Sequence, residues 1–378
     1  GKQMRVLAQS CYAKYANKVG QKFENPENGY VGEYLDDIVE KIIEKYGNDL
    51  EENDEKFRTF TEKEIFENIQ ETLNSLNIVF DVFSKEKSFY DNGSINEVLK
   101  TLEKLSLSYK KDGAIWFKTT ALGKEEDKVL VKSTGEPTYR LPDIAYHIDK
   151  IKREFDLIVD IFGADHIDTY PDVLLALESL GHNIDHIKVV IHQFVTLKED
   201  GKVVKMSTRK ANFVTLDELI EKLSVDIIRY FFIMRGANSH LDFDLNLAMD
   251  ESEKNPVYYL QYAHARIANL GKRFKKEVGE TNKINLQLLD KEDEISLMKK
   301  LSQFPEKMEQ LHESLEPRQL ATYLEELAAQ YHKFYGNHKV IDLDNTELSH
   351  ARMALCDATQ IIFKIGLSIL GITAPERM

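Results

Sequence analysis

Positively charged and hydroxyl side chains gather in one short segment of this 378-residue chain. They are Lys202, Lys205, Ser207, Thr208, Arg209 and Lys210, with Met206 among them. Lysine and arginine neutralise phosphate charge, and hydroxyl and backbone N–H groups donate hydrogen bonds to phosphate oxygens. The preceding Asp200-Gly201 is typical of a two-residue hairpin turn. The segment is either a phosphate-binding loop or an exposed basic hairpin tip, and no Gly-Lys-Ser/Thr stretch of a P-loop enzyme is present.

Tyr139 and Asp143 could bind a flat cation. They flank the start of a predicted helix, in which Pro142 suits the first turn. A carboxylate accepts two hydrogen bonds from a guanidinium, and an aromatic ring stacks on that group or offers its hydroxyl. The alternative is that Asp143 is an ordinary acidic residue in a first turn, where the helix dipole favours a negative charge.

Two further pairs of residues have side chains that can bind a metal ion, but their sequence surroundings do not support a metal site. His182 and His186 are spaced like zinc ligands, but Gly181 before them indicates a loop and no third ligand is obvious. Asp242 and Asp244 alternate with apolar residues, like the edge of a strand or turn. We therefore predict no protein-bound metal.

A tyrosine- and arginine-bearing helix is predicted to begin at Pro256. Tyr259, Tyr262 and Arg266 lie on it, followed by a basic end. Aromatic rings and arginine on one helix suit an unstacked RNA loop, because bases stack on the rings while the cation contacts phosphate. The alternative is an ordinary helix core with a charged end.

The order of the predicted elements places these groups. Residues 1 to about 105 show helical stripes, strands and helices alternate from about 112, and from Thr215 to Met378 we predict helices alone. The apolar run at 157–162 is typical of a parallel strand covered on both faces. It is followed by Gly163-Ala164-Asp165-His166. Strand, helix and strand in this order predict a doubly wound α/β sheet, whose ligands bind at the carboxyl ends of the strands.

Composition narrows the class of protein. The formal net charge is −14, which argues against indiscriminate coating of nucleic acid but allows a local basic patch. Two cysteines, Cys11 and Cys356, exclude a disulfide-stapled fold and a cysteine-based zinc site. No apolar run reaches the ~18 residues of a membrane span, and no signal core opens the chain. We expect a cytoplasmic protein that does not contact membranes.

Four segments in this order resemble the bacterial arginyl-tRNA synthetases, which are class I aminoacyl-tRNA synthetases. They are 133–139 running into 143–147, then 163–166, then Lys-Met-Ser-Thr-Arg at 205–209, and Gln-Tyr-Ala-His-Ala-Arg at 261–266. The ending at 371–378 is similar to the family's C-terminus. The resemblance implies an α/β plus all-α fold with a partial doubly wound parallel, Rossmann-like sheet. Its domains would be a helical insertion at 1–110, the second half of the catalytic domain at 111–235, and a helical-bundle anticodon-binding domain at 236–378.

The resemblance also implies a reaction. L-Arginine attacks the α-phosphate of ATP to give arginyl-adenylate and pyrophosphate, and the arginyl group then passes to tRNA(Arg). Tyr139, Asp143 and His166 would line the arginine pocket, with Asp143 as the partner of the guanidinium. The residues expected to bind ATP, accompanied by Mg²⁺, are Gly163, Asp165, Lys205, Met206 and Ser207. Those expected in catalysis are Lys205, Ser207, Thr208 and Arg209. Those expected to contact tRNA are Tyr259, Tyr262, Arg266 and Met378. We expect a monomer.

The chain departs from the family's pattern in two ways. Thr208 stands where the loop motif has its second lysine, so Arg209 or Lys210 would have to supply that charge. No His-x-Gly-His segment, the family's other ATP-binding signature, is found, and Gly1 falls inside the helical insertion. We therefore expect a C-terminal fragment without the family's N-terminal domain. Two rivals stay open: another nucleotidyl-transferring α/β enzyme, and a non-catalytic tRNA-binding module.

The missing signature gives a first prediction. The isolated chain should show little or no arginine-dependent exchange between ATP and pyrophosphate, because half of the residues expected around ATP are absent. Incorporation of labelled pyrophosphate into ATP measures this directly. Exchange at the rate of a complete enzyme would contradict the prediction.

Overall fold

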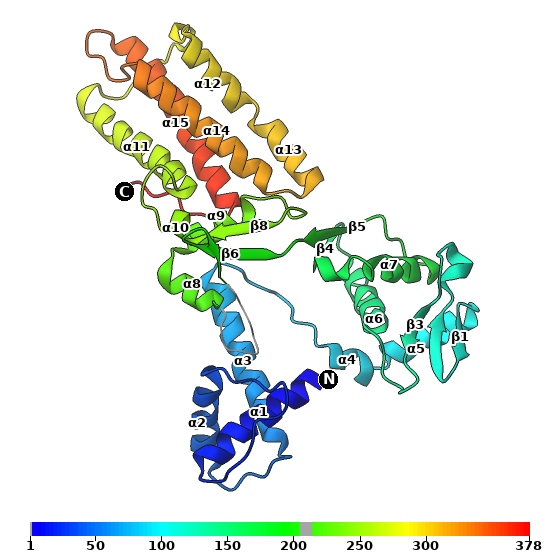
Figure 1. The fold of residues 1–378 in the computed structure, drawn as a ribbon. Coiled ribbons are helices and arrows are strands. Elements are labelled where there is room, and N and C mark those ends of the chain that lie inside the picture. Colours follow the sequence, from blue (N-terminus) through cyan, green and yellow to red (C-terminus); the bar gives the residue numbers. More distant parts are fainter. Residues whose placement is uncertain (1, 205–213) are drawn as a thin grey trace. The chain divides into compact units, whose positions relative to one another are not determined.

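The computed structural model describes residues 2–204 and 214–378. They form two compact units, each described here by itself (Figure 1). Unit 1 comprises Gly1–Val79, Thr196–Arg235 and Asp242–Met378, and unit 2 comprises Phe80–Val195 and Gly236–Leu241. In the described residues, no helix is both long enough and apolar enough to cross a lipid bilayer.

Unit 2 alternates helices and strands, as the sequence predicts. In chain order its elements are α4 (Glu86–Asp91), α5 (Ser94–Lys104), β1 (Ser108–Lys111), β2 (Ala114–Phe117), the short 3-10 helix η1 (Thr119–Leu122), β3 (Lys128–Val131), α6 (Arg140–Ile151), β4 (Ile158–Gly163), the 3-10 helix η2 (Ala164–His166), α7 (Tyr170–Ser179) and β5 (Ile187–His192). Strands β1, β2 and β3 form an antiparallel sheet, and β4 pairs with β5 in parallel. The core gathers apolar side chains from α5, α6, α7 and the strands, including Leu102, Phe117, Leu141, Ile144 and Leu177.

The parallel pair differs from expectation in one respect. The prediction that the 157–162 run is covered on both faces is wrong for the described residues, because Ile161 is 70% exposed. Ile158 and Asp160, which alternate with it, are buried. Successive side chains of a strand point to opposite faces, and the buried face packs against residues of α6 and α7. An apolar run of strand length did not distinguish one covered face from two.

Unit 1 contains a small sheet whose turn the sequence predicts. Its strands are β6 (Val195–Glu199), β7 (Lys202–Val203) and β8 (Leu241–Asp244), in the order β7-β6-β8. Asp200 and Gly201 have φ of 50° and 71°, the left-handed values that a tight hairpin turn needs. Strand β8 corrects the prediction of helices alone after Thr215, and it forms because buried Leu241 and Phe243 alternate with polar neighbours.

The remainder of unit 1 is helical. Its elements are α1 (Lys2–Lys18), α2 (Tyr34–Tyr46), α3 (Glu55–Ser75), α8 (Leu216–Lys222), α9 (Val225–Ile233), α10 (Leu245–Ala248), α11 (Pro256–Glu277), the 3-10 helix η4 (Leu286–Leu288), α12 (Glu292–Ser302), α13 (Phe304–Ser314), α14 (Arg318–Asn337) and α15 (Thr346–Ile369). Thr215 and Glu218 form a capping box at the start of α8, with both hydrogen bonds at 3.1 Å. Helices α11, α14 and α15 pack against one another in a bundle (Figure 1).

Arg229 of α9 joins two chain segments that are distant in sequence. Its guanidinium donates to the carbonyl of Leu76, just after α3, at 2.7 Å, and to that of Leu370, just after α15, at 3.1 Å. Gly371 has φ of +70°, and a Cβ atom there would lie 2.3 Å from the Arg229 guanidinium. A side chain at 371 would therefore strain the backbone and displace Arg229 from both carbonyls.

The change Gly371→Ala should lower the free energy of unfolding by about 1–3 kcal/mol, through the left-handed backbone and the lost hydrogen bonds. Urea denaturation followed by circular dichroism measures this. Gly336→Ala, in α14 with no atom within 4 Å of the added Cβ, is the matched control and should stabilise by up to about 1 kcal/mol. Equal stability of the two variants would show that position 371 tolerates a side chain.

Candidate functional site

Asp143 occupies the first turn of α6, as predicted, and is half-buried. Tyr139 precedes the helix at the N-cap position, and its carbonyl accepts a hydrogen bond from the backbone N–H of Asp143 at 3.2 Å. The Tyr139 side chain is 79% exposed. The structure therefore places these two residues one helical turn apart, with the carboxylate partly withdrawn from water and the ring in solvent.

The Asp143 carboxylate has the electrostatics of a site for a cation. Burial raises the pKa of its carboxyl above the ordinary value, and electrostatic interactions with His147, His166 and Lys150 act against that rise. Within the described parts of the chain, no cationic nitrogen lies within 4 Å of this carboxylate. A guanidinium placed there would stabilise the ionised form and bring the pKa back down.

A buried polar network behind Asp143 fixes helix α6 against strand β4. His147 contacts the Asp143 carbonyl through Nδ1 at 2.7 Å and Asp160 Oδ2 through Nε2 at 2.8 Å. Lys150 forms an ion pair with the other oxygen of Asp160. Burial alone would raise the pKa of the Asp160 carboxyl, but the hydrogen bonds from His147 and Lys150 outweigh it and hold that pKa below its ordinary value. Sequence reasoning gave these three residues no role, although a single acid inside an apolar run was a usable signal.

The loop after β4 brings one further predicted residue toward Asp143. Gly163 ends the strand opposite His192. His166, in the short helix η2, stacks on Phe162 with ring centres 5.2 Å apart and planes 14° apart. An electrostatic interaction with His166 lowers the pKa of Asp143, while Asp165 is exposed. The loop thus supplies an imidazole ring at the carboxyl end of β4, where ligands of α/β sheets bind.

The predicted phosphate-binding residues fall in a different part of the chain. Lys205, Met206, Ser207, Thr208 and Arg209 all lie outside the described residues. Their assignments to ATP binding and catalysis therefore stay predictions.

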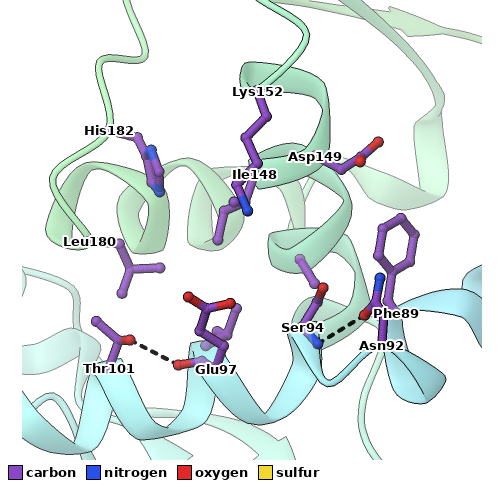
Figure 2. A pocket seen from close by; sticks show the side chains of 12 residues that line it. Phe89, Asn92, Ser94, Glu97, Thr101, Ile148, Asp149, Lys152, Leu180 and His182 are labelled. Atoms are coloured by element: carbon purple, nitrogen blue, oxygen red, sulfur yellow. Dashed lines mark hydrogen bonds between the residues drawn. The ribbon is translucent and has the colours of Figure 1, made fainter.

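A cavity of unit 2 lies elsewhere, between α5 and α6 (Figure 2), with a volume of about 340 Å³. Figure 2 shows Glu97 and Thr101 on the α5 side and Ile148 and Lys152 on the α6 side. Residues of an α-helix are about 100° apart around its axis, so Ile148 and Lys152 face nearly opposite to Asp143. Among the predicted site residues that the structure describes, none lines this cavity. His182 does, but in the described residues no group of three potential ligands is arranged to hold a metal ion.

A second cavity, of about 230 Å³, lies in the helical bundle of unit 1 and contains three of the four residues predicted to contact tRNA. Tyr262, Arg266 and Met378 line it, together with Ala265, Asn269, Leu270, Arg273 and Tyr335. Tyr262 and Arg266 share one face of α11 because they are four residues apart. The guanidinium carbon of Arg266 lies 4.1 Å from the centre of the Tyr335 ring and 5.7 Å from that of Tyr262. The result is an open surface of stacked aromatic and cationic groups.

Tyr259, the fourth of these residues, does not line this cavity. Its ring lies 5.1 Å from that of His332, and burial raises the pKa of its hydroxyl, with the charges of Glu253 and Glu325 adding to the rise. Two neighbouring carboxylates would repel a phosphate. Tyr335 and Asn269 line the cavity but were not predicted to do so, and no sequence signal joined Tyr335, on α14, to a helix so far away.

Comparison with known proteins covers both parts of the chain. Residues 17–229 match the family described as tRNA synthetases class I (R), catalytic domain, and residues 260–378 match the DALR anticodon binding domain. The whole chain is 49% identical to the arginine–tRNA ligase of Desulfotalea psychrophila and 45% identical to that of Salinibacter ruber. It spans 69% and 70% of the length of these two relatives.

Solved structures show the same architecture. A Campylobacter jejuni protein provisionally named an arginyl-tRNA synthetase superposes over the whole chain with a TM-score of 0.89 at 29% identity, and the match covers 83% of that protein. The Thermus thermophilus arginyl-tRNA synthetase matches 98% of this chain and 74% of its own, with a TM-score of 0.73. At 18% identity the second likeness concerns the fold alone.

Proposed function

Because the chain belongs to the arginyl-tRNA synthetase family, we propose that it serves the ligation of L-arginine to tRNA(Arg) with ATP as the second substrate. The observation that carries this function is the match to curated arginine–tRNA ligases over the full length of the chain. The rival reading as a non-catalytic tRNA-binding module is not favoured, since 17–229 match a catalytic domain. We also propose that the protein is a monomer and that it acts in the cytoplasm, where tRNA is charged for protein synthesis.

Two steps make up the reaction. The carboxylate of arginine attacks the α-phosphorus of ATP, forming arginyl-adenylate and releasing pyrophosphate. A ribose hydroxyl at the tRNA 3′ end then attacks the arginyl carbonyl, and AMP leaves. The protein contributes orientation and neutralisation of phosphate charge. We assign the phosphate contacts to Lys205, Ser207, Thr208 and Arg209. We assign ATP binding to Lys205, Met206 and Ser207, and also to Gly163 and Asp165, which lie at and just after the end of β4. Mg²⁺ would enter with the ATP phosphates, as it does in many nucleotide sites.

Arginine recognition is supported by the state of Asp143. A half-buried carboxylate that has no cation of the described residues within ion-pair distance suits a guanidinium, which fits it through two parallel hydrogen bonds. A lysine side chain has no planar fork and would form a poorer match. His166 acts on this carboxylate from the end of β4. The exposed Tyr139 ring lies at the N-cap of α6, where it could cover a bound arginine side chain.

Recognition of tRNA is supported by the bundle cavity. Tyr262 is 41% exposed and Met378 is 58% exposed, so apolar surface is available for unpaired bases to stack on. Arg266 and Arg273 border the same cavity and can contact phosphates. The cavity lies within the segment that matches an anticodon binding domain.

The pKa of Asp143 leads to a prediction about arginine. In a protein of the relatives' length that carries this chain, Asp143→Asn should raise the KM for arginine roughly 100-fold, because a charged hydrogen-bonded partner is lost. The KM for ATP should change little. Asp149→Asn, about 120° around α6 from Asp143 and beside the cavity between α5 and α6, is the matched control. An unchanged arginine KM in the Asn variant would remove Asp143 from the pocket.

The pH dependence has a definite sign. The guanidinium needs the ionised carboxylate, so affinity for arginine should be full above the pKa of Asp143 and fall as the pH drops through it. Since burial raises that pKa, the fall should begin at a higher pH than for an ordinary aspartate of pKa about 3.9. In Asp143→Asn, the affinity for arginine should not show this fall with decreasing pH.

A further prediction concerns the bundle cavity. Tyr262→Ala should weaken binding of tRNA(Arg) about 10-fold, since stacking on one ring is worth about 1–3 kcal/mol per base. Fluorescence titration of the isolated chain measures this. Tyr258→Ala, on the same helix but outside the cavity, is the control and should bind as the parent does. Equal affinities of the two variants would leave Tyr262 as a packing residue.

A further inference from the structure

The last residues of the chain run along helix α11 and end at the bundle cavity. Thr373 contacts Gln261, Pro375 contacts His264, Glu376 contacts Lys272, and Met378 lines the cavity with Tyr262 and Arg266. We call residues 373–378 the C-terminal tail. All of these residues belong to unit 1.

Asp226, in the first turn of α9, anchors the start of the tail. Its carboxylate accepts a hydrogen bond from the backbone N–H of Thr373 at 3.0 Å and another from the Thr373 hydroxyl. The side-chain amide of Gln261, itself nearly buried, donates to the same carboxylate at 2.7 Å and lies 3.1 Å from the Thr373 carbonyl. One carboxylate and one amide thus satisfy the N–H, hydroxyl and carbonyl of a single tail residue.

His264 anchors the tail two residues further on. Its Nδ1 lies 2.8 Å from the Pro375 carbonyl, and since a carbonyl can only accept, the imidazole donates. The His264 side chain is 3% exposed, so this hydrogen bond is shielded from water. By contrast, the ion pair between Lys272 and Glu376 at 2.6 Å is exposed and contributes little.

These anchors limit where Met378 can be. Met378 lies only three positions after Pro375, and an extended chain spans at most about 3.6 Å per residue. More than half of the Met378 side chain is exposed, so its own burial does little to hold it at the cavity. An unanchored tail would have to be ordered when RNA binds, and ordering backbone costs conformational entropy. Anchoring it beforehand removes that cost from binding.

We infer that Asp226, Gln261 and His264 are positioning residues for tRNA recognition: they hold the C-terminal tail on α11 and thereby present Met378 at the bundle cavity. This inference rests on the proposed function, in which that cavity binds tRNA. None of the three residues was predicted to take part in tRNA binding, and none of them lines the cavity.

The first test follows the tail without RNA. Release of Met378 by a carboxypeptidase should be faster in Asp226→Ala and Thr373→Val than in the parent chain, on the order of 10-fold, because the tail opens more often. Thr373→Ser keeps the hydroxyl and should behave as the parent does. The exposed position of Thr373 makes its variants informative even if Asp226→Ala fails to fold. Unchanged release in Thr373→Val would overturn the inference whether or not the chain binds tRNA.

The second test is a double-mutant cycle with a transcript of tRNA(Arg). Thr373→Val and Met378→Ala should each weaken binding, by about 3- to 10-fold, and the double variant should be no weaker than the weaker single variant, because residues that act through one another are not additive. If the loss of affinity in the double variant equalled the product of the two single losses, Thr373 would act independently of Met378 and the inference would be overturned.

The two proposals fail differently in these tests. Absence of tRNA binding by the parent chain, or no effect of Tyr262→Ala, would count against the proposed function. If Tyr262→Ala lost affinity for tRNA(Arg) as expected but Thr373→Val bound it as the parent chain does, only the inference about the tail anchors would be contradicted.

Discussion

A buried negative charge on strand β4 sets the arrangement of unit 2. Transferring the Asp160 carboxylate out of water is expensive unless charged partners hydrogen-bond to it. Both partners, His147 and Lys150, belong to α6, so their contacts with Asp160 fix the rotation of this helix about its own axis relative to β4. That rotation directs Asp143 toward the strand-end residue His166 and directs Ile148 and Lys152 to the cavity on the other side. The chemistry expected of Asp143 thus depends on the contacts that His147 and Lys150 make with Asp160.

Local patterns in the sequence were enough for the elements and for the chemical character of several residues. The hairpin turn at Asp200-Gly201 and the capping box at Thr215 are short-range signals, and both are present. The chemistry of a carboxylate in a helical first turn also needs no distant partner. What escaped prediction depends on residues far apart: the exposed face of β4, the network on Asp160, and Tyr335 across from Arg266.

The bundle cavity illustrates this limit. Tyr262 and Arg266 were grouped because they lie one turn apart on a single predicted helix. Tyr259 was grouped with them on the same grounds, yet it lies outside the cavity and near two acidic side chains. Helical spacing gives the face on which a residue lies, but which neighbour covers that face is set by the packing of α14 and the path of the chain after α15. Composition carried even less information here, since a net charge of −14 coexists with a locally cationic surface.

The junction at Arg229 bears on the order in which the protein can be built. Its two acceptors, the carbonyls of Leu76 and Leu370, are separated by about 300 residues of chain. Contacts between such remote segments form late, because the intervening chain must first be closed into a loop. During synthesis from the amino end, the helices before Leu76 emerge long before their partner exists. Nascent unit 1 must therefore wait for its final helix before this junction can close, and a ribosome stalled shortly before that point would carry the unit with the junction open.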